Sequence, residues 1–370
     1  MKIALGSKIY DKPWGGGNLF IKNLSEYLIS NGHEVVFSLN DSDVDLVLLM
    51  DPRTSSEGAT FNHNDIARYK RLVKSNVVVI QRINECDQRK DTKGVNEFYL
   101  KSNSIADHTV FVSKWLKNIY KNEGFEDLNY SIIMSGSDIS IFNNSDFQEW
   151  KSGEKFKIVT HHWGNNKNKG FEVYQKLDSL LNDKYWNELI EFQFIGNLNE
   201  EYQFYNTKIT EPLSGLELAK EIKKNNAYIT GSINEPSGNH HIESSQCGLP
   251  LLYLNSGGIP EFANDYGLEY EIDNFEEKIQ YLIDNYSHYF KLMKKYPFSS
   301  KNMSMEYEEL FLDLLDKNKK NNQINSSIYK FIFFVLYRIK YFFKFNFLGK
   351  YLFQIYLKVK FIMSRNKINL

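Results

Sequence analysis

The stretch NEPSGNHHIESSQCGLPLLYLNSGGIPE occupies residues 234–261 and carries the clearest pattern in the chain. An apolar run at residues 227–231 comes just before it and predicts a strand. Residues 239–247 are expected to form a helix, and residues 250–254 a second apolar strand that leads to the glycine turn 256–258. This order of strand, loop, helix and strand is the repeating unit of a parallel α/β sheet.

The same alternation continues toward both ends of the chain. Continuous apolar strands separated by helices indicate parallel sheets that are buried on both faces. Further strands are predicted at residues 2–6, 34–39, 44–50, 77–80, 108–112, 156–160 and 191–195, and helices at residues 19–30, 66–75, 114–122, 170–181, 216–224 and 275–284. The predicted fold class is therefore α/β, with two doubly wound Rossmann-like domains.

The length of 370 residues favours two domains of roughly 150 residues each. Asn, Ser, Asp and Gly concentrate between Asn143 and Glu154, and we expect the linker there. The predicted organisation is an N-terminal domain at residues 1–148, a C-terminal domain at residues 149–316, and a basic aromatic tail at residues 317–370.

Composition excludes several classes of protein. Hydrophobic residues at 42% and charged residues at 25% are typical of a globular protein. The two cysteines, Cys86 and Cys247, offer neither a disulfide framework nor a four-thiolate zinc site, which favours a reducing compartment. The N-terminal sequence MKIALGSKIY has an apolar run too short for a signal-peptide core. We therefore expect a cytoplasmic catalytic body.

The charge distribution is uneven. The net charge is −1, but residues 317–370 contain twelve Lys and Arg and no Asp or Glu, which leaves about −13 on residues 1–316. An acidic body is a poor partner for nucleic acid, because phosphate contacts need clustered positive charge. We expect no nucleic-acid partner.

The quoted stretch also places chemistry at one end of the predicted sheet. Glu235 follows a strand at the sheet edge where ligands bind in open α/β folds. Gly238 permits close approach of the backbone, and a helix that begins at Asn239 directs free N–H groups at an anion such as a diphosphate. Glu243 lies one turn into that helix, where a carboxylate can accept hydrogen bonds from vicinal ribose hydroxyls.

This stretch resembles the signature of retaining glycosyltransferases of family 4, which have the two-domain GT-B architecture with a cleft between the domains. Two glutamates separated by seven residues, a Cys-Gly-Leu-Pro segment at 247–250 and a Gly-Gly-Ile-Pro-Glu segment at 257–261 carry the resemblance. It implies that Glu243 holds the ribose and Glu235 contacts the transferred sugar. It further implies contacts to phosphate or sugar from the backbone at Gly238, Asn239, His240, Gly257 and Gly258.

Two other segments extend the resemblance. The pair Lys169-Gly170 follows a predicted strand and matches the family's phosphate loop, so Lys169 is expected to neutralise the leaving diphosphate. The arginine that usually precedes this pair is absent, and His162 is among the residues available in its place. The loop after the first strand contains Gly16 and Gly17, which are expected on the diphosphate side.

The acceptor is expected on the N-terminal domain. A polar cluster follows the strand at residues 77–80 and consists of Arg82, Asn84, Glu85, Asp87, Arg89 and Lys90. Because this cluster lies at the carboxyl end of a strand, Arg82 and Asp87 are candidate acceptor-binding residues.

The resemblance implies transfer of a sugar from a nucleotide-sugar substrate to a glycan or lipid-linked glycan, with retention of anomeric configuration. No cofactor and no essential metal are expected. His161 and His162 do not predict a zinc site, because adjacent residues share one ligand geometry poorly and no third ligand is near. Two alternatives stay open: a nucleotide-sugar epimerase of the same architecture, and a non-catalytic nucleotide-sugar-binding scaffold subunit.

The tail has an amphipathic pattern. At 100° per residue, Lys330, Arg338, Lys340 and Lys344 fall on one side of a helix whose opposite side is strongly apolar. Such a helix suits the plane of a membrane surface, with rings at the acyl boundary and cations at anionic headgroups. We therefore expect peripheral association with the inner face of the membrane and a role in surface polysaccharide synthesis, although packing of the tail on protein is the alternative.

Overall fold

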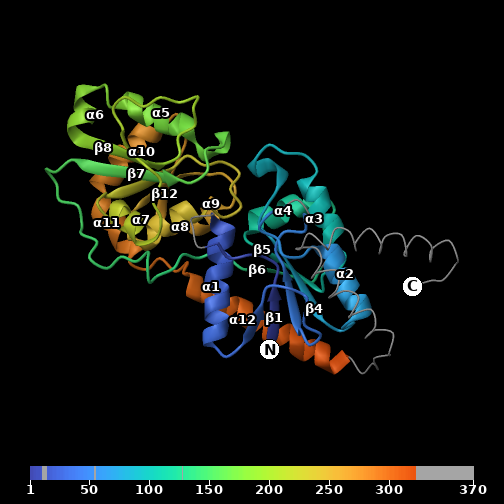
Figure 1. The fold of residues 1–370 in the computed structure, drawn as a ribbon. Coiled ribbons are helices and arrows are strands. Elements are labelled where there is room, and N and C mark those ends of the chain that lie inside the picture. The colour runs from blue at the N-terminus through green and yellow to red at the C-terminus, as the bar shows by residue number, and fades with distance from the viewer. Residues whose placement is uncertain (11–14, 54–55, 127, 322–370) are drawn as a thin grey trace, which may run out of the picture.

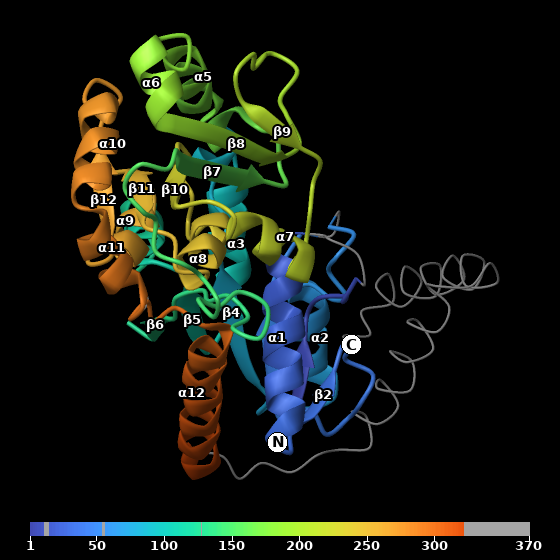
Figure 2. The ribbon, with the colours of Figure 1, turned by 90° about the vertical axis from the view of Figure 1, so that its left-hand side faces the viewer.

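The computed structural model describes residues 1–10, 15–53, 56–126 and 128–321. Within these ranges the chain forms two six-stranded sheets, each flanked by helices (Figures 1 and 2). Neighbouring strands of both sheets pair in parallel. The predicted fold class, α/β with two doubly wound sheets, is confirmed.

The first sheet has the strand order β2-β1-β3-β4-β5-β6. Its strands are β1 (Lys2–Leu5), β2 (Glu34–Val36), β3 (Leu46–Leu49), β4 (Val78–Ile83), β5 (His108–Phe111) and β6 (Tyr130–Ile132). Its helices are α1 (Gly16–Ser30), α2 (His63–Leu72), α3 (Val95–Asn103) and α4 (Lys114–Asn122), with a short 3-10 turn, η1 (Asp87–Arg89), after β4. The order reverses between β1 and β3, and the loops that follow these strands border that point.

The second sheet has the strand order β12-β11-β10-β7-β8-β9. Its strands are β7 (Phe156–His162), β8 (Ile190–Gly196), β9 (Lys208–Thr210), β10 (Ala227–Thr230), β11 (Leu251–Leu254) and β12 (Gly267–Tyr270). The helical elements are η2 (Lys167–Lys169), α5 (Phe171–Leu180), α6 (Lys184–Leu189), α7 (Gly215–Ile222), α8 (Asn239–Gln246), α9 (Ile259–Ala263), α10 (Phe275–Asp284) and α11 (Tyr286–Met293). Here the order reverses between β7 and β10, so the loops after these two strands lie side by side.

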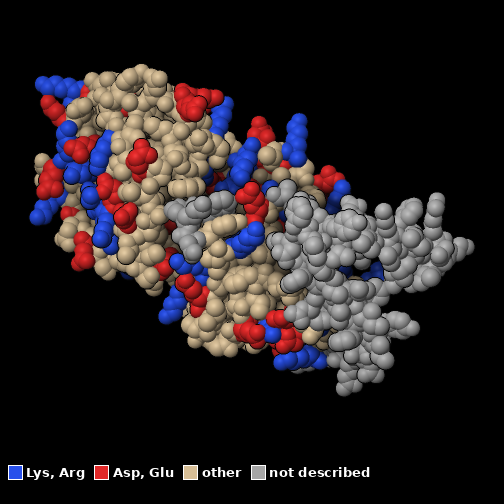
Figure 3. Space-filling view, viewed as in Figure 1, with Lys and Arg blue, Asp and Glu red and all other residues tan. Residues whose placement is uncertain are grey.

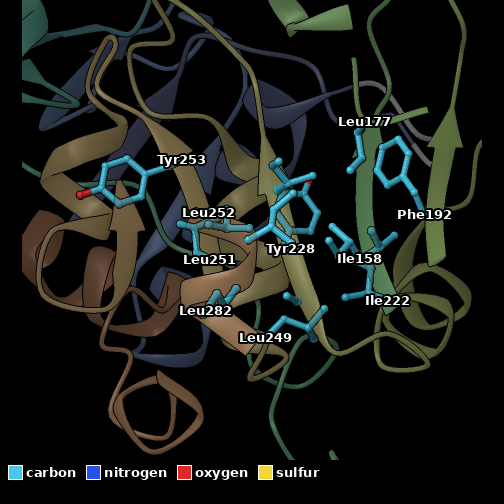
Figure 4. Close-up of a cluster of buried hydrophobic side chains, with 14 of the residues drawn as sticks. Ile158, Leu177, Phe192, Ile222, Tyr228, Leu249, Leu251, Leu252, Tyr253 and Leu282 are labelled. Atoms are coloured by element: carbon cyan, nitrogen blue, oxygen red, sulfur yellow. The ribbon is translucent and has the colours of Figure 1, made fainter. Parts of the chain in front are cut away.

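The core of the second sheet explains why its strands read as continuous apolar runs. Ile158 on β7, Tyr228 on β10 and Leu252 on β11 are fully buried, and helices cover both faces (Figure 4). A central parallel strand covered on both faces has no solvent-exposed face, so its residues are apolar at consecutive positions instead of alternating between apolar and polar.

Several elements were not predicted. The strands β6, β9 and β12 each lie at the edge of a sheet, and of their ten residues only Tyr270 is buried. An edge strand buries little, so its sequence carries little apolar pattern. The helices α3, α6, α9 and α11 are short and also were not predicted.

The last described helix, α12 (Ser300–Asn321), returns to the first sheet. Its buried side chains Met303, Tyr307 and Phe311 pack with residues of α1 and of the first sheet, and Figures 1 and 2 show α12 beside α1. This corrects the predicted domain division, which placed residues 300–316 with the C-terminal domain. The spacing of four residues between these buried positions is the helical signal that identifies the segment.

The chain therefore crosses between the two halves twice, and the crossings touch each other. The amide of Ser137 donates to the carbonyl of Phe298 at 3.2 Å, and the amide of Ser300 donates to the carbonyl of Ser137 at 2.7 Å. A Cβ on Gly136 would lie 2.2 Å from the backbone of Ser299, so the close approach requires glycine. Among the described residues, no helix has the length and apolar character needed to span a membrane. The predicted amphipathic helix lies in residues 322–370, outside the described part of the chain.

We expect Phe311→Ala to lower the free energy of unfolding by about 3–5 kcal/mol, because it removes a ring from the junction of α12 with the first sheet. The neighbouring Leu312 is 51% exposed, so Leu312→Ala should change the unfolding free energy by no more than about 0.5 kcal/mol. Urea denaturation followed by circular dichroism measures both. Equal effects of the two substitutions would contradict the packing of α12 described above.

Candidate active site

Two glycines hold together the loops that follow β7 and β10. A Cβ on Gly170, whose φ is +85°, would lie 2.2 Å from the backbone of Gly231. The amide of Ile233 donates to the carbonyl of Asn168 at 2.9 Å and ties the same two loops a second time. This backbone contact brings the predicted phosphate loop against the predicted sugar-binding loop.

The contact places Lys169 next to Glu235. The Lys169 ammonium donates to Oε1 of Glu235, and both side chains are buried. Burial by itself raises the pKa of Glu235, but the positive charges of Lys169 and Arg89 outweigh it and hold the pKa well below its usual range. The two residues predicted to act in catalysis therefore form one buried pair in which the Glu235 carboxylate is ionised.

The glycine turn before α9 supports the main chain of Glu235. The amide of Gly258 donates to the carbonyl of Glu235 at 2.8 Å, and the amide of Asn234 donates to Oγ of Ser256 at 3.0 Å. A Cβ on Gly257 would lie 2.4 Å from the Glu235 carbonyl oxygen. Gly257 and Gly258 thus lie beside the site, and the contacts they make in the structure position Glu235.

The N-termini of α1 and α8 meet across the two halves of the molecule. A Cβ on Gly16, in the first turn of α1, would lie 3.1 Å from the side chain of Asn239, in the first turn of α8. Gly15 and Gly238 precede the two helices, and among the described residues no side chain caps either end. The unpaired N–H groups and the positive ends of two helix dipoles converge there, which suits an anion.

Glu243 projects from the first half of α8 toward β7. Its Oε2 lies 3.0 Å from Nε2 of His161, and both side chains are about 92% buried. His161 is a partner of Glu243 that the sequence did not assign. A carboxylate held on one oxygen by an imidazole keeps its second oxygen for another hydrogen-bond donor.

Buried histidines line the base of this region. The rings of His162 and His240 lie 4.7 Å apart, and both residues are less than a tenth exposed. His162 bonds the Tyr174 hydroxyl at 2.6 Å, and His240 bonds the Thr230 hydroxyl at 2.9 Å. Both predicted donor-site histidines are therefore bonded to side chains of the core beneath the loops.

Burial keeps these histidines neutral. It moves the pKa of His162 and of His240 well below the usual value, and it lowers the pKa of His241 to about 4 despite a bond to the Ser237 carbonyl. Among the described residues, Nδ1 of His161, His162 and His241 has no hydrogen-bond partner. His162, His240 and His241 are thus uncharged imidazoles near neutral pH.

Several contacts close the two halves against each other. Both carboxylate oxygens of Glu261, on α9, accept from the first two backbone amides of α4, at 2.8 Å from Lys114 and 2.7 Å from Trp115. Oγ of Ser135 donates to Oγ of Ser237 at 3.2 Å. Arg89, on the loop after β4, reaches Glu235 with Nε 3.4 Å from Oε2. The sequence did not predict these contacts, because they join residues more than one hundred positions apart.

A cavity of about 380 Å³ lies at the carboxyl ends of β1, β3 and β4. Gly17 lines it, together with Lys8, Asp51, Arg53, Glu85 and Tyr99. Arg53 forms a two-pronged bond to Asp51, at 2.9 Å from Nε and 2.7 Å from Nη2. The wall thus offers donors, acceptors and an aromatic ring, which is the chemistry that hydroxyl-rich ligands need.

The two residues predicted to bind the acceptor have other partners. Arg82 is 4% exposed and lies beneath α1, with its guanidinium 3.9 Å from the Phe20 ring centre. Asp87 accepts from the amides of Val95 and Asn96 at 3.1 and 3.0 Å and so caps α3. Neither lines the cavity. Their neighbour Glu85, from the same polar cluster, does line it.

Among the described residues, no group of three or more His, Cys, Asp or Glu side chains has the geometry to hold a metal ion. On the face drawn in Figure 3, basic and acidic side chains are interspersed over the second half of the molecule. On that part of the molecule the described residues present no continuous basic surface to a phosphate backbone.

No protein-family model matches the chain, and no curated protein matches it. Several solved structures match its fold over nearly all of their own length. Sucrose-phosphate synthase from Thermosynechococcus elongatus has a TM-score of 0.59 at 13% identity, covering 85% of this chain and 99% of the other. HepE from Anabaena in complex with UDP has a TM-score of 0.62 at 12% identity, covering 85% and 100%. The chain has the GT-B glycosyltransferase fold.

A third GT-B match is WaaG, described as a glycosyltransferase involved in lipopolysaccharide biosynthesis. It has a TM-score of 0.59 at 10% identity, covering 84% of this chain and 99% of the other. At such low identities the likeness establishes the GT-B fold, and the chemistry must be argued from the residues of the site itself.

We expect acid to destabilise this GT-B chain through its buried histidines. His241 binds a proton near pH 6.5 in the unfolded chain but only near pH 4 in the folded chain. The unfolding free energy therefore falls as the pH is lowered from 6.5 to 4. From pH 7.5 to pH 5 this residue alone should remove about 2 kcal/mol of unfolding free energy. Urea denaturation at the two pH values should show a smaller loss for His241→Gln than for the wild type.

The exposed His288 provides the control, because His288→Gln should leave the acid destabilisation unchanged. The assignment fails if His241→Gln and the wild type lose the same unfolding free energy between the two pH values.

Proposed function

We propose that this chain is a retaining glycosyltransferase that moves a sugar from a nucleotide-sugar donor to a glycan or lipid-linked glycan. The observation that supports this best is the convergence of Lys169, Glu235 and Glu243 with two uncapped helix N-termini where the halves of the molecule meet. Cations and helix N-termini suit a diphosphate, and two carboxylates suit the hydroxyls of the sugars on either side of it.

In the proposed complex the donor lies across the site. Glu243, held by His161, receives the ribose hydroxyls on its second oxygen. Glu235 receives hydroxyls of the transferred sugar, and the diphosphate lies between them near Lys169 and the first turns of α1 and α8. HepE has been solved in complex with UDP-glucose, which supports a UDP-sugar as the first donor to test.

The proposed step is a front-side displacement at the anomeric carbon. The bond from that carbon to the β-phosphate oxygen breaks, and the acceptor hydroxyl oxygen forms the new bond from the same face. The acceptor proton passes to an oxygen of the departing diphosphate. Lys169 and the helix N-termini stabilise the charge that develops on the diphosphate, and removal of one such donor typically raises the barrier by about 3 kcal/mol.

We propose that the acceptor binds in the 380 Å³ cavity of the first half. Arg53 and Asp51 would provide hydrogen bonds to the hydroxyls of a sugar. This replaces Arg82 and Asp87 as acceptor residues, because their side chains are used by the fold. A membrane-surface partner, at the cytoplasmic face, remains a proposal from the tail sequence alone.

Substitution of the two glutamates tests the donor site. We expect Glu243→Ala to raise the Kd for the donor at least about tenfold, because a charge-assisted bond to the ribose is lost. Glu235→Ala should instead lower kcat by about 10²–10³-fold, since it removes a contact beside the reacting carbon. Calorimetry and product chromatography with a panel of UDP-, GDP- and ADP-sugars measure the two effects.

The exposed Glu271 supplies a matched control, since Glu271→Ala should leave both constants unchanged. Near-wild-type transfer by both site variants would reject the donor assignment. Conversion of donor without an acceptor into an isomeric nucleotide sugar would point to an epimerase, and absence of any turnover with retained binding would point to a scaffold subunit.

The cavity proposal has a separate test. We expect Arg53→Ala to raise the KM for the glycan acceptor about tenfold and to leave slow hydrolysis of the donor by water unchanged, because Arg53 lines the cavity and Lys169 and Glu235 do not. Lys93, exposed on the neighbouring loop, is the control. An unchanged acceptor KM in Arg53→Ala would place the acceptor elsewhere.

A further inference from the structure

The loop after β4 carries a positive charge into the second half of the molecule. Within the first half, Asp87 anchors this loop, residues 84–94, by capping α3. From the second half, Nδ2 of Asn168 donates to the carbonyls of Gln88 and Arg89 at 3.2 and 3.0 Å. The loop therefore docks on the phosphate loop through its backbone, and its side chains are placed by that docking.

Arg89 extends from this loop to the site. Its Nη1 donates to Oε2 of Glu85 at 3.0 Å, and its Nε lies 3.4 Å from Oε2 of Glu235. Nε is buried, and no described residue accepts a hydrogen bond from it. Its partner in the protein is therefore the Glu235 ion pair at 3.4 Å, which leaves the N–H able to take a closer acceptor from a ligand.

Glu235 thus lies between two cations from opposite halves of the chain. Lys169 contacts Oε1 and Arg89 approaches Oε2, while the carboxylate is only 5% exposed. Arg89 also pairs with Glu85, and Glu85 has a second cationic neighbour, the half-exposed Lys90, at 3.6 Å. A bound diphosphate adds about two negative charges, and the other lysine of the phosphate loop, Lys167, is exposed.

We propose that Arg89 is a second cation of the donor site and contacts the β-phosphate of the bound nucleotide sugar. This rests on the proposed function, in which the donor runs from Glu243 to Glu235. The β-phosphate carries the sugar, so it lies at the Glu235 end, where Nε of Arg89 has no hydrogen-bond acceptor among the described residues. A guanidinium has several donors in one plane, so it can keep its bond to Glu85 and still bond a phosphate oxygen.

The consequence is a donor site that is complete only when the two halves are closed. Lys169 lies on the loop after β7 of the second sheet, whereas Arg89 lies on the loop after β4 of the first. Asn168 holds the loop of Arg89 in place. Binding of a diphosphate would draw the two cations together and thereby favour the closed arrangement, in which the acceptor cavity faces the donor.

The test compares nucleotides that differ only in the β-phosphate. Binding of UDP and UMP to the full-length chain is measured by isothermal titration calorimetry, with GDP and GMP, and ADP and AMP, as further pairs. We expect Arg89→Ala to raise the Kd for the diphosphate about tenfold and that for the monophosphate less than twofold. Arg89→Lys should recover part of the loss, because it keeps the charge and loses the planar donors.

Lys90→Ala is the matched control, because Lys90 adjoins Arg89, lies 3.6 Å from Glu85 and makes no described contact with Glu235. Its nucleotide affinities should equal those of the wild type. A double-mutant cycle with Glu235→Gln separates a direct contact from an indirect one. The diphosphate-specific loss on Arg89→Ala persists in the Glu235→Gln background if Arg89 touches the phosphate, and vanishes if Arg89 only holds Glu235.

The outcomes distinguish this inference from the proposed function. If the wild type binds none of the six nucleotides, both are rejected. If the wild type binds a diphosphate and Lys169→Ala weakens that binding, the donor site stands. In that case an Arg89→Ala variant that loses nothing, or loses diphosphate and monophosphate affinity equally, rejects the role of Arg89 alone.

Discussion

The buried carboxylate of Glu235 is the constraint around which the site is organised. Removal of a carboxylate from water costs several kcal/mol unless it is paired, and here the fold supplies Lys169 from one side and Arg89 from the other. The backbone contact between Gly170 and Gly231 brings Lys169 within reach. The glycine turn at Gly257 and Gly258 holds the main chain of Glu235 from behind.

The same arrangement joins the two halves of the molecule. Glu261 caps α4, Asn168 holds the loop of Arg89, and the first turns of α1 and α8 lie against each other. The contacts of Glu261 and Asn168 each satisfy backbone groups of one half with a side chain of the other. A charged ligand at this junction would interact with both halves at once, which links binding to closure.

The part of the fold that is buried on both faces was predictable, because central parallel strands such as β10 and β11 must be apolar throughout. The edge strands β6 and β9 were not, since they bury too little to leave a pattern. The return of α12 to the first sheet was also missed. Helical spacing identifies that helix, but its own residues do not indicate which of the two sheets its apolar face will cover.

The sequence by itself determined the two-sheet α/β fold, because the fold class depends on periodicity within each strand-loop-helix unit. The resemblance to family 4 selected Lys169, Glu235 and Glu243 as candidates, and the structure brings Lys169 to Glu235. Only the tertiary structure decided the partners. In the folded chain Arg82 is buried beneath α1, and Asp87 caps α3. His161 forms a hydrogen bond with Glu243, and Arg89 forms an ion pair with Glu235. These contacts join residues between eight and about 150 positions apart, and their formation depends on the direction in which each side chain leaves a folded backbone, which residue type and local spacing do not specify.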